Sequence, residues 1–402
     1  DAAPPALCYT MSDTDCGYTP EPVTPADVSL ADQQALAVRF NPAMVYTGDA
    51  VWAVSFDMLL VHGAPLQRAE HDGRLNFSYK VDETTTENVF ATQPADLRTV
   101  DLTGQPTTAQ SGRGYVYFLN FPGTNEGNEY AQQSWKAEWT NIQGNDPTAA
   151  PFPPFQYAHL FWLDKAQRLL AIQYFFYYPY DKFTNAHEGD WEHINVILRY
   201  PETGAASLAM AHFSYHGRQL GIPAENLYRV GDGGNGDHVV AFIGGDGCLN
   251  YVDSCWCGDT SGASYPYPGL YDLGYWEEVA GGASRPGRAV HAEDFTVQLL
   301  PRVEDIDFTA EPQLSWYALP FIAGQPTTPA NHAAVIATNN HRAPVGPGPE
   351  HDEFEVGIEE TDPALEQGAA TPFVVPGTWT MLNEPPSSVF GTLPTNDNCS
   401  NP

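Results

Sequence analysis

The feature that most constrains this chain is a run of seven residues, 187–193, that holds two imidazoles and three carboxylates. Apolar runs rich in aromatic and β-branched residues flank it, at 169–178 and at 194–198, and such runs are typical of buried strands. Charged side chains at the junction of two core strands cost free energy unless something pairs with them. A divalent metal ion is the candidate partner.

The spacing of the carboxylates within this run predicts that two of them share a face. Asp190 and Glu192 are two residues apart, so their side chains point the same way on an extended strand. The same parity continues through the apolar residues that follow, which places both carboxylates at the mouth of a buried face. His193 falls on the opposite parity and is the weaker candidate for a metal ligand.

The predicted metal ligands are three carboxylates and one imidazole: Asp181, His187, Asp190 and Glu192. His187 precedes Gly189, where the chain can turn back toward Asp190, and Asp181 lies at the far end of the same loop. This oxygen-rich set favours Ca²⁺ or Mg²⁺, with Mn²⁺ as a further candidate, over a structural zinc. The alternative is a polar cluster held by hydrogen bonds or salt bridges without a metal.

The sequences YPYD at 178–181 and AHEGDWE at 186–192 resemble the central motif of the vacuolar protein sorting-associated protein 62 (Vps62) family. They resemble more distantly that of the necrosis-inducing (NPP1, Nep1-like) secreted proteins, which is also similar at SYHG, 214–217. Those proteins are β-sandwiches whose motif binds a divalent cation, so the resemblance implies a cation at the same four residues. Glu188 and Gly189 replace their Arg and His, which argues against transfer of their host-lipid recognition and toxicity.

The resemblance to the sorting-protein family extends well beyond the central motif. LAVRFNP at 36–42 and VSFDMLLVHGA at 54–64 are similar to the opening phrases of that family, so the resemblance covers about Leu36 to Tyr251. The family continues from a later strand into Gly-Ser-His-Ala. This chain has GDGC at 245–248 instead, and the family's histidine is missing.

Short strands alternating with polar turns predict an all-β fold with a β-sandwich-like core, few short helices and long loops. Strands are expected at 114–119, 157–162, 208–216 and 238–243. Ser29 is the predicted N-cap of a short helix through Gln33 to Val38, and 125–139 is expected to hold another helix. We expect an irregular arm at 1–28, one large Vps62-like domain at 29–385 with an acidic loop at 349–366, and a tail at 386–402.

The charge balance excludes some partners. With 17 basic and 50 acidic residues the net charge is −33, which argues against nucleic acid and against simple electrostatic attachment to anionic lipid. No run of about 18 apolar residues occurs, so no transmembrane segment is expected. Peripheral contact with a membrane stays open.

The cysteines indicate an oxidising environment. None of them forms a Cys-x-x-Cys pair, which argues against a zinc ribbon or a thioredoxin-type centre. Their even number predicts up to three disulfides, and we therefore expect a secreted protein whose leader has been removed. The six are Cys8, Cys16, Cys248, Cys255, Cys257 and Cys399.

Three functions are compatible with such a site. The first is binding of a polar ligand, a glycan or a glycolipid head group, through the metal. The second is metal-dependent hydrolysis of an ester, phosphoester or glycoconjugate, with His216 or Glu188 as the candidate group that moves protons. The third is a metal that only ties two strands together. The sequence contains neither a Gly-x-Ser-x-Gly elbow nor a P-loop, which argues against serine-nucleophile and P-loop chemistry. The resemblance favours binding, because it is mostly to proteins that have no established reaction, but whether the protein is an enzyme stays open.

Overall fold

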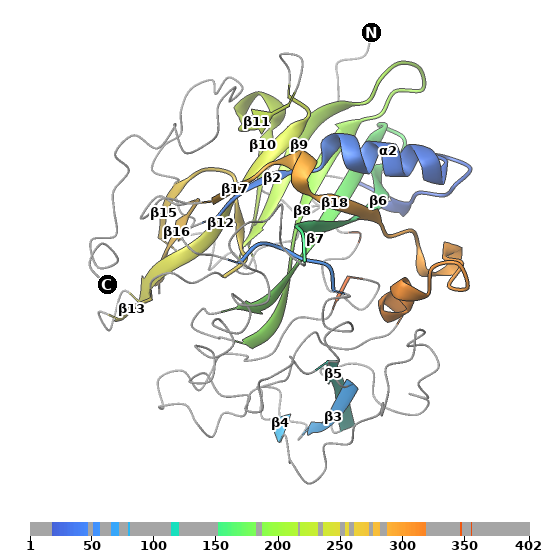
Figure 1. The fold of residues 1–402 in the computed structure, drawn as a ribbon. Coiled ribbons are helices and arrows are strands. Elements are labelled where there is room, and N and C mark those ends of the chain that lie inside the picture. Colours follow the sequence, from blue (N-terminus) through green and yellow to red (C-terminus); the bar gives the residue numbers. More distant parts are fainter. Residues whose placement is uncertain are drawn as a thin grey trace.

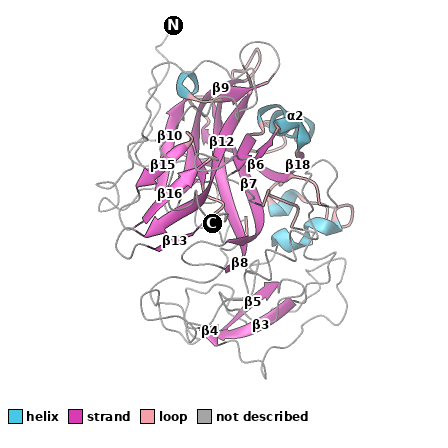
Figure 2. Ribbon diagram, turned by 60° about the vertical axis from the view of Figure 1, so that its left-hand side comes forward, coloured by secondary structure: helices cyan, strands magenta, loops and turns pink. Residues whose placement is uncertain are grey.

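The computed structural model describes residues 18–46, 51–56, 66–71, 79–80, 114–119, 152–181, 187–215, 218–231, 236–249, 254–256, 261–272, 276–281, 288–318, 346–347 and 355. Strands dominate these residues, and the few helices lie at the periphery (Figures 1 and 2). The predicted all-β, sandwich-like fold is confirmed. None of the helices in these ranges is long and apolar enough to cross a membrane.

The first large sheet has seven strands in the order β1-β6-β7-β8-β9-β10, and β18 pairs in parallel with β6. Four of its central strands, β6 to β9, are joined in antiparallel succession, so this sheet is a meander around the central motif. The bounds are β1 (Glu21–Pro22), β6 (Phe155–Asp164), β7 (Leu169–Asp181), β8 (His187–Arg199), β9 (Ser207–Tyr215), β10 (Arg218–Pro223) and β18 (Thr296–Leu299).

The second large sheet has eight strands and is built around β12, which pairs with β2, β11, β13, β14 and β16. The bounds are β2 (Ala43–Tyr46), β11 (Arg229–Val230), β12 (His238–Leu249), β13 (Ser254–Trp256), β14 (Ser264–Tyr265), β15 (Gly269–Asp272), β16 (Trp276–Ala280) and β17 (Arg288–Val290). A separate small sheet has the order β4-β3-β5, with bounds β3 (Leu66–His71), β4 (Tyr79–Lys80) and β5 (Gly114–Leu119).

Helix α2 (Leu30–Phe40) begins where its N-cap was predicted. The Ser29 hydroxyl accepts a hydrogen bond from the backbone N–H of Asp32 at 3.2 Å, which satisfies one of the donors left open at a helix start. The helix is longer than the predicted segment through Gln33 to Val38. The short 3₁₀ segments are η3 (Ala224–Asn226), η4 (Ala292–Asp294), η5 (Val303–Asp305) and η6 (Pro312–Ala318).

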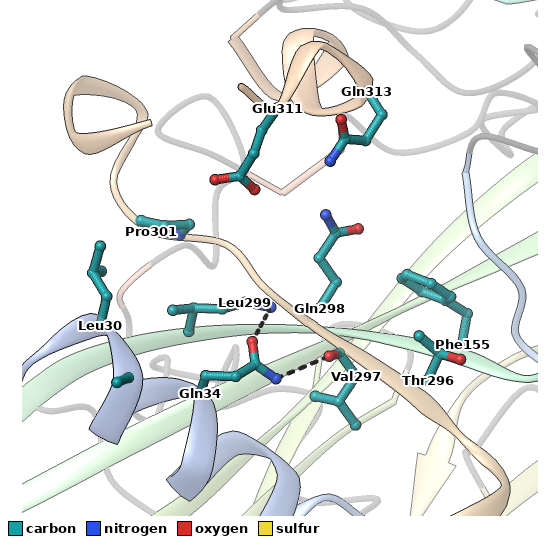
Figure 3. Close-up of a pocket in the computed structure, with 11 residues that line it drawn as sticks. Leu30, Gln34, Phe155, Thr296, Val297, Gln298, Leu299, Pro301, Glu311 and Gln313 are labelled. Atoms are coloured by element: carbon teal, nitrogen blue, oxygen red, sulfur yellow. Dashed lines mark hydrogen bonds between the residues drawn. The ribbon is translucent and has the colours of Figure 1, made fainter. Parts of the chain in front are cut away.

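One side chain joins α2 to the first sheet. The carboxamide of Gln34 donates to the carbonyl oxygen of Val297 at 3.0 Å and accepts from the backbone N–H of Leu299 at 3.2 Å (Figure 3). Both partners belong to β18, so Gln34 hydrogen-bonds to the backbone of that strand in the way that a neighbouring strand would.

Strands β7 and β8 form a long antiparallel hairpin whose register runs from Leu169 opposite Arg199 to Asp181 opposite His187. The strands predicted at 169–178 and 194–198 are confirmed, but both continue into the polar motif. The apolar pattern ends before the hairpin does because ladder hydrogen bonds need only backbone groups, which polar residues supply equally well.

The main core lies between the two large sheets and is rich in tyrosine. The ring of Tyr178 packs against Tyr46 of the second sheet with centroids 6.4 Å apart, and Tyr215 packs against Tyr265 at 4.7 Å. The Tyr174 hydroxyl donates to the carbonyl oxygen of Ala37 at 2.8 Å, which fixes α2 against β7. Buried aromatic side chains of this kind each contribute about 1.5–3 kcal/mol.

The opposite face of the first sheet is also buried. Trp191 stacks on Trp316 of η6 with centroids 5.5 Å apart. Farther along this face, the Glu355 carboxylate contacts the buried imidazole of His159, Nε2 to Oε1, at 2.9 Å. The backbone N–H of Glu355 donates to the Gln173 side chain at 3.2 Å.

The remaining structural predictions divide into those confirmed and those outside the described residues. The strands expected at 114–119, 157–162, 208–216 and 238–243 are present as β5, β6, β9 and β12; β5 has the expected bounds, and the other three have shifted ends. The helix expected at 125–139, the tail at 386–402 and all of the acidic loop except Glu355 lie outside the described residues. The predicted domain boundaries therefore stay predictions.

Candidate functional site

Two carboxylates of the central motif face the space between the large sheets. The register places Asp190 opposite Tyr178 and Glu192 opposite Phe176, and residues opposite each other share a face of the sheet. Tyr178 packs on Tyr46 of the second sheet, so this face is the inner one. The predicted shared parity of Asp190 and Glu192 is confirmed.

The environment of Asp190 strongly disfavours a charge. Its side chain is 5 % exposed, and burial raises the pKa of its carboxyl to about 8, although a hydrogen bond from the backbone N–H of Trp191 acts in the opposite direction. The pKa of the neighbouring Tyr178 hydroxyl is raised well above its ordinary value, first by burial and then by Tyr46, Glu192 and Asp190. Without a cation, a group with this pKa holds its proton at neutral pH.

The other two predicted ligands lie at the end of the hairpin. Asp181 is buried at the end of β7, and the register sets it opposite His187, the first residue of β8. Gly189 has a φ of +65°, the left-handed region that glycine adopts without strain. The strands are paired on both sides of Gly189. The backbone therefore does not turn back toward Asp190 at this glycine, contrary to the prediction, and His187 lies opposite Asp181 in the ladder.

The register places the backbone of all four predicted ligands in one hairpin. The side chains of His187 and Glu188 lie outside the described part, so the complete ligand set is not tested. Among the side chains that are described, no group of three or more His, Cys, Asp and Glu residues is close enough to hold a metal ion. The metal site at Asp181, His187, Asp190 and Glu192 therefore stays a prediction.

His193 lies on the other face of the sheet, as its parity predicted. Its Nε2 is 3.0 Å from the Ser214 hydroxyl, and its ring packs on Phe175 with centroids 5.7 Å apart. Ser214 and His212 share this face of β9, which turns away from Asp190 and Glu192. His216, the candidate proton-transfer residue, follows the end of β9 and lies outside the described residues.

Aromatic residues of the β7–β8 hairpin and of β9 could stack on a sugar ligand if their rings were free, but they are only partly described. Tyr178 and Tyr215 are buried in the core, so neither offers a free ring face for a sugar. The side chains of Tyr180 and Phe183 lie outside the described residues.

A scan against protein-family models gives no match for this chain. A search of curated protein sequences gives none either.

Solved structures that match are of Nep1-like proteins. The non-toxic protein HaNLP3 is 13% identical with a TM-score of 0.28, over 73% of this chain and 83% of that one. Necrosis and Ethylene inducing Protein 2 from the causal agent of cocoa's witches' broom disease is 14% identical with a TM-score of 0.23, over 58% and 68%. NLPPya in complex with glucosamine is 16% identical with a TM-score of 0.24, over 62% and 74%.

These matches are to the more distant of the two families that the central motif resembles. TM-scores and identities this low establish neither membership of that family nor a shared ligand. The resemblance to the vacuolar sorting family stays a prediction.

A surface groove of about 660 Å³ lies elsewhere, between α2, β18 and the 3₁₀ segment η6 (Figure 3). Gln298 points into it from β18, and Glu311 and Gln313 approach from the other side. None of the predicted site residues lines this groove, so it is separate from the carboxylate pair.

Residues that the sequence did not single out form the wall opposite Glu192. Gly262, with a φ of +73°, lies so close that an added Cβ would be 3.0 Å from Glu192 Cγ and 2.9 Å from Tyr178 Cδ2. The neighbouring Ser261 and Tyr265 hydroxyls both donate to the fully buried carboxylate of Glu278. No local pattern marks these residues, because they meet β8 only through the packing of the two sheets.

Proposed function

We propose that this chain is a secreted, divalent-metal-binding β-sandwich protein that binds a polar ligand, a glycan or glycolipid head group, at the central motif. The proposed metal ligands are Asp181, His187, Asp190 and Glu192. Their three carboxylates and one imidazole fit Ca²⁺ or Mg²⁺ best, with Mn²⁺ third.

The observation that carries the proposal is the burial of Asp190 beside Glu192 between two sheets. A carboxyl whose pKa is about 8 is unstable as an anion unless a cation compensates the lost hydration. A bound divalent cation would hold both carboxylates ionised. Such a cation supplies an electrophilic position for hydroxyl or phosphate oxygens of a ligand if protein does not occupy its whole coordination shell.

The proposal is tested first by the metal content of the protein. Protein purified without chelator or added metal is analysed by elemental mass spectrometry beside an Asp190→Asn, Glu192→Gln double variant. The matched control removes one exposed glutamate and one exposed aspartate, Glu202→Gln and Asp305→Asn. Near-stoichiometric Ca, Mg or Mn in the wild type and the control, lost in the double variant, supports the site. Absence of metal from the wild type after soaking in each cation contradicts it.

The ligand is tested separately on metal-loaded protein. Glucosamine and mannosamine, the amino sugars present in two of the similar solved structures, and phosphorylated head groups are titrated by calorimetry with and without EDTA. Binding that disappears with EDTA and in the double variant supports a metal-dependent binding protein. Stoichiometric metal without binding of any of these ligands would indicate that the metal has only a structural role, which is to hold two strands together. Cleavage of the ligand in the same samples would make the protein a hydrolase.

A further inference from the structure

A fully buried carboxylate in the second sheet holds the turn that faces the proposed metal ligands. Glu278 of β16 accepts hydrogen bonds from the Ser261 hydroxyl on Oε1 and from the Tyr265 hydroxyl on Oε2. Because an unpaired buried carboxylate is costly, this arrangement fixes both donors in place. The two donors lie on either side of Gly262 and Ala263, the segment that leads into β14 and is called the turn below.

The backbone of this turn is also fixed to β12. The backbone N–H of Gly244 donates to the carbonyl oxygen of Ala263 at 2.9 Å, and the Ser261 hydroxyl accepts from the backbone N–H of Ala263 at 3.2 Å. The turn is therefore held at both ends by Glu278 and in the middle by β12, which leaves it little freedom to move away from β8.

Gly262 is the residue by which this turn reaches the other sheet. Its φ of +73° suits glycine, and an added Cβ would lie 2.9 Å from the Tyr178 ring and 3.0 Å from Glu192 Cγ. Distances this short leave no room for even one methyl group between Gly262 and the stem of Glu192. The second sheet thereby limits the positions that the Glu192 stem can take on this side.

We infer that Glu278 and Gly262 are positioning residues for the metal ligand Glu192, an inference that rests on the proposed function. Glu278 fixes the position of the turn, and Gly262 lets the turn pack closely against Glu192. The carboxylate of Glu192 therefore approaches the cation in a single geometry. Mg²⁺ demands nearly ideal octahedral coordination, whereas Ca²⁺ tolerates irregular coordination. A displaced Glu192 therefore weakens Mg²⁺ binding more than Ca²⁺ binding.

The test is calorimetric titration of full-length Gly262→Ala with Mg²⁺ and with Ca²⁺. Groups that orient metal ligands typically alter affinity by about 10- to 100-fold, so we expect at least a tenfold loss for Mg²⁺ and a smaller loss for Ca²⁺. A merely structural effect would leave the ratio of the two affinities unchanged. The matched control is Gly204→Ala, where φ is +104° and an added Cβ would meet only Pro201 Cγ, at 3.9 Å. It carries backbone strain without touching the site, and wild-type affinities are expected.

A second pair of variants tests the role of Glu278. Glu278→Gln keeps the shape but can accept only through its one remaining oxygen, and we expect the same change in the Mg²⁺ to Ca²⁺ ratio. If it does not fold, Ser261→Ala removes one donor and leaves the carboxylate. Folded Gly262→Ala with wild-type affinities for both cations would overturn the inference and leave the proposed function standing. A wild type that binds neither cation would overturn both.

Discussion

At the scale of single residues, the alternating direction of side chains along one strand predicted the most about the candidate site. Parity alone placed Asp190 and Glu192 on the inner face and His193 on the other, because a strand side chain has only two directions available. Gly262 and Glu278 could not be found in this way, since they reach Glu192 through contacts between sheets and belong to segments about 70 to 90 residues farther along the chain. The ligand role of Asp181, His187, Asp190 and Glu192 stays a prediction.

The pKa of Asp190 predicts how stability depends on pH in the absence of metal. The folded protein holds this proton up to about pH 8, whereas an unfolded aspartate, with an ordinary pKa of 3.8, releases it much earlier. The unfolded state therefore binds fewer protons between these values, so the free energy of unfolding falls as pH rises through this range. In EDTA, Asp190→Asn should lose less stability than the wild type between pH 5 and pH 9.

This dependence is measured by thermal unfolding of both proteins across that pH range. Glu202→Gln, a change at an exposed position, serves as the control and should follow the wild type. Parallel curves for the wild type and Asp190→Asn would show that Asp190 titrates normally in the folded protein.

The contact between His159 and Glu355 predicts a shared proton. Nδ1 of His159 lies 2.8 Å from the carbonyl oxygen of Leu300, which only accepts, so Nδ1 carries a hydrogen. Nε2 faces Glu355 Oε1 at 2.9 Å, and this bond needs a second proton, on the imidazole or on the carboxyl. In Glu355→Gln the side-chain amide can donate a hydrogen bond to Nε2. A neutral His159 imidazole with its hydrogen on Nδ1 can then make both hydrogen bonds.

Imidazole ¹⁵N chemical shifts report this difference. In the wild type a proton lies between Nε2 and Oε1, so the Nε2 shift should move toward that of a protonated nitrogen, and Glu355→Gln should show Nε2 as an unprotonated acceptor. Glu355→Ala, which removes the carboxylate from the buried imidazole, should cost about 0.5–1.5 kcal/mol of stability, the usual contribution of one hydrogen bond. Identical shifts in the wild type and Glu355→Gln would contradict the prediction.

At the scale of elements, the sequence located the strands better than their ends. The motif at 187–193 was expected at the junction of two strands, with a turn at Gly189, and the whole of it is part of β8. Apolar periodicity reports burial, but pairing depends on the partner backbone, and β7 extends far enough to pair with the whole motif. Helix α2 was longer than expected for a related reason, since packing against β7 and β18 stabilises turns that propensity alone does not mark.

The register of β12 and β13 predicts one disulfide. It places Cys248 directly opposite Cys255, and opposite residues of an antiparallel pair have Cβ atoms about 4.5–5.5 Å apart, near the range that a disulfide requires. We expect these two cysteines to be bonded. Peptide mapping without reduction should yield one cross-linked peptide that separates after reduction, whereas a link from Cys248 to a terminal cysteine would contradict the register.

At the scale of the whole molecule, the net charge of −33 makes any cation stabilising to some degree through screening. The stabilisation that comes from specific binding must exceed the stabilisation that comes from screening. At a concentration of Ca²⁺ or Mg²⁺ about 100 times the dissociation constant, binding should add about 2.7 kcal/mol to the free energy of unfolding. NaCl at equal ionic strength should add less.

Urea unfolding in the two salts separates these effects. The Asp190→Asn, Glu192→Gln double variant should respond to both salts alike, because only screening remains. A wild type that also responds alike would mean that the acidic surface, and no defined site, is what the cations stabilise.

The hydrogen bonds of Gln34 have a consequence for the behaviour of the protein in concentrated solution. Strand β18 lies at an edge of the first sheet, and an unpaired edge can recruit a strand from another molecule. The carboxamide of Gln34 has the donor and acceptor of a peptide group and already occupies Leu299 N–H and Val297 C=O. A single side chain on a helix thus keeps this part of the edge from growing into an intermolecular sheet.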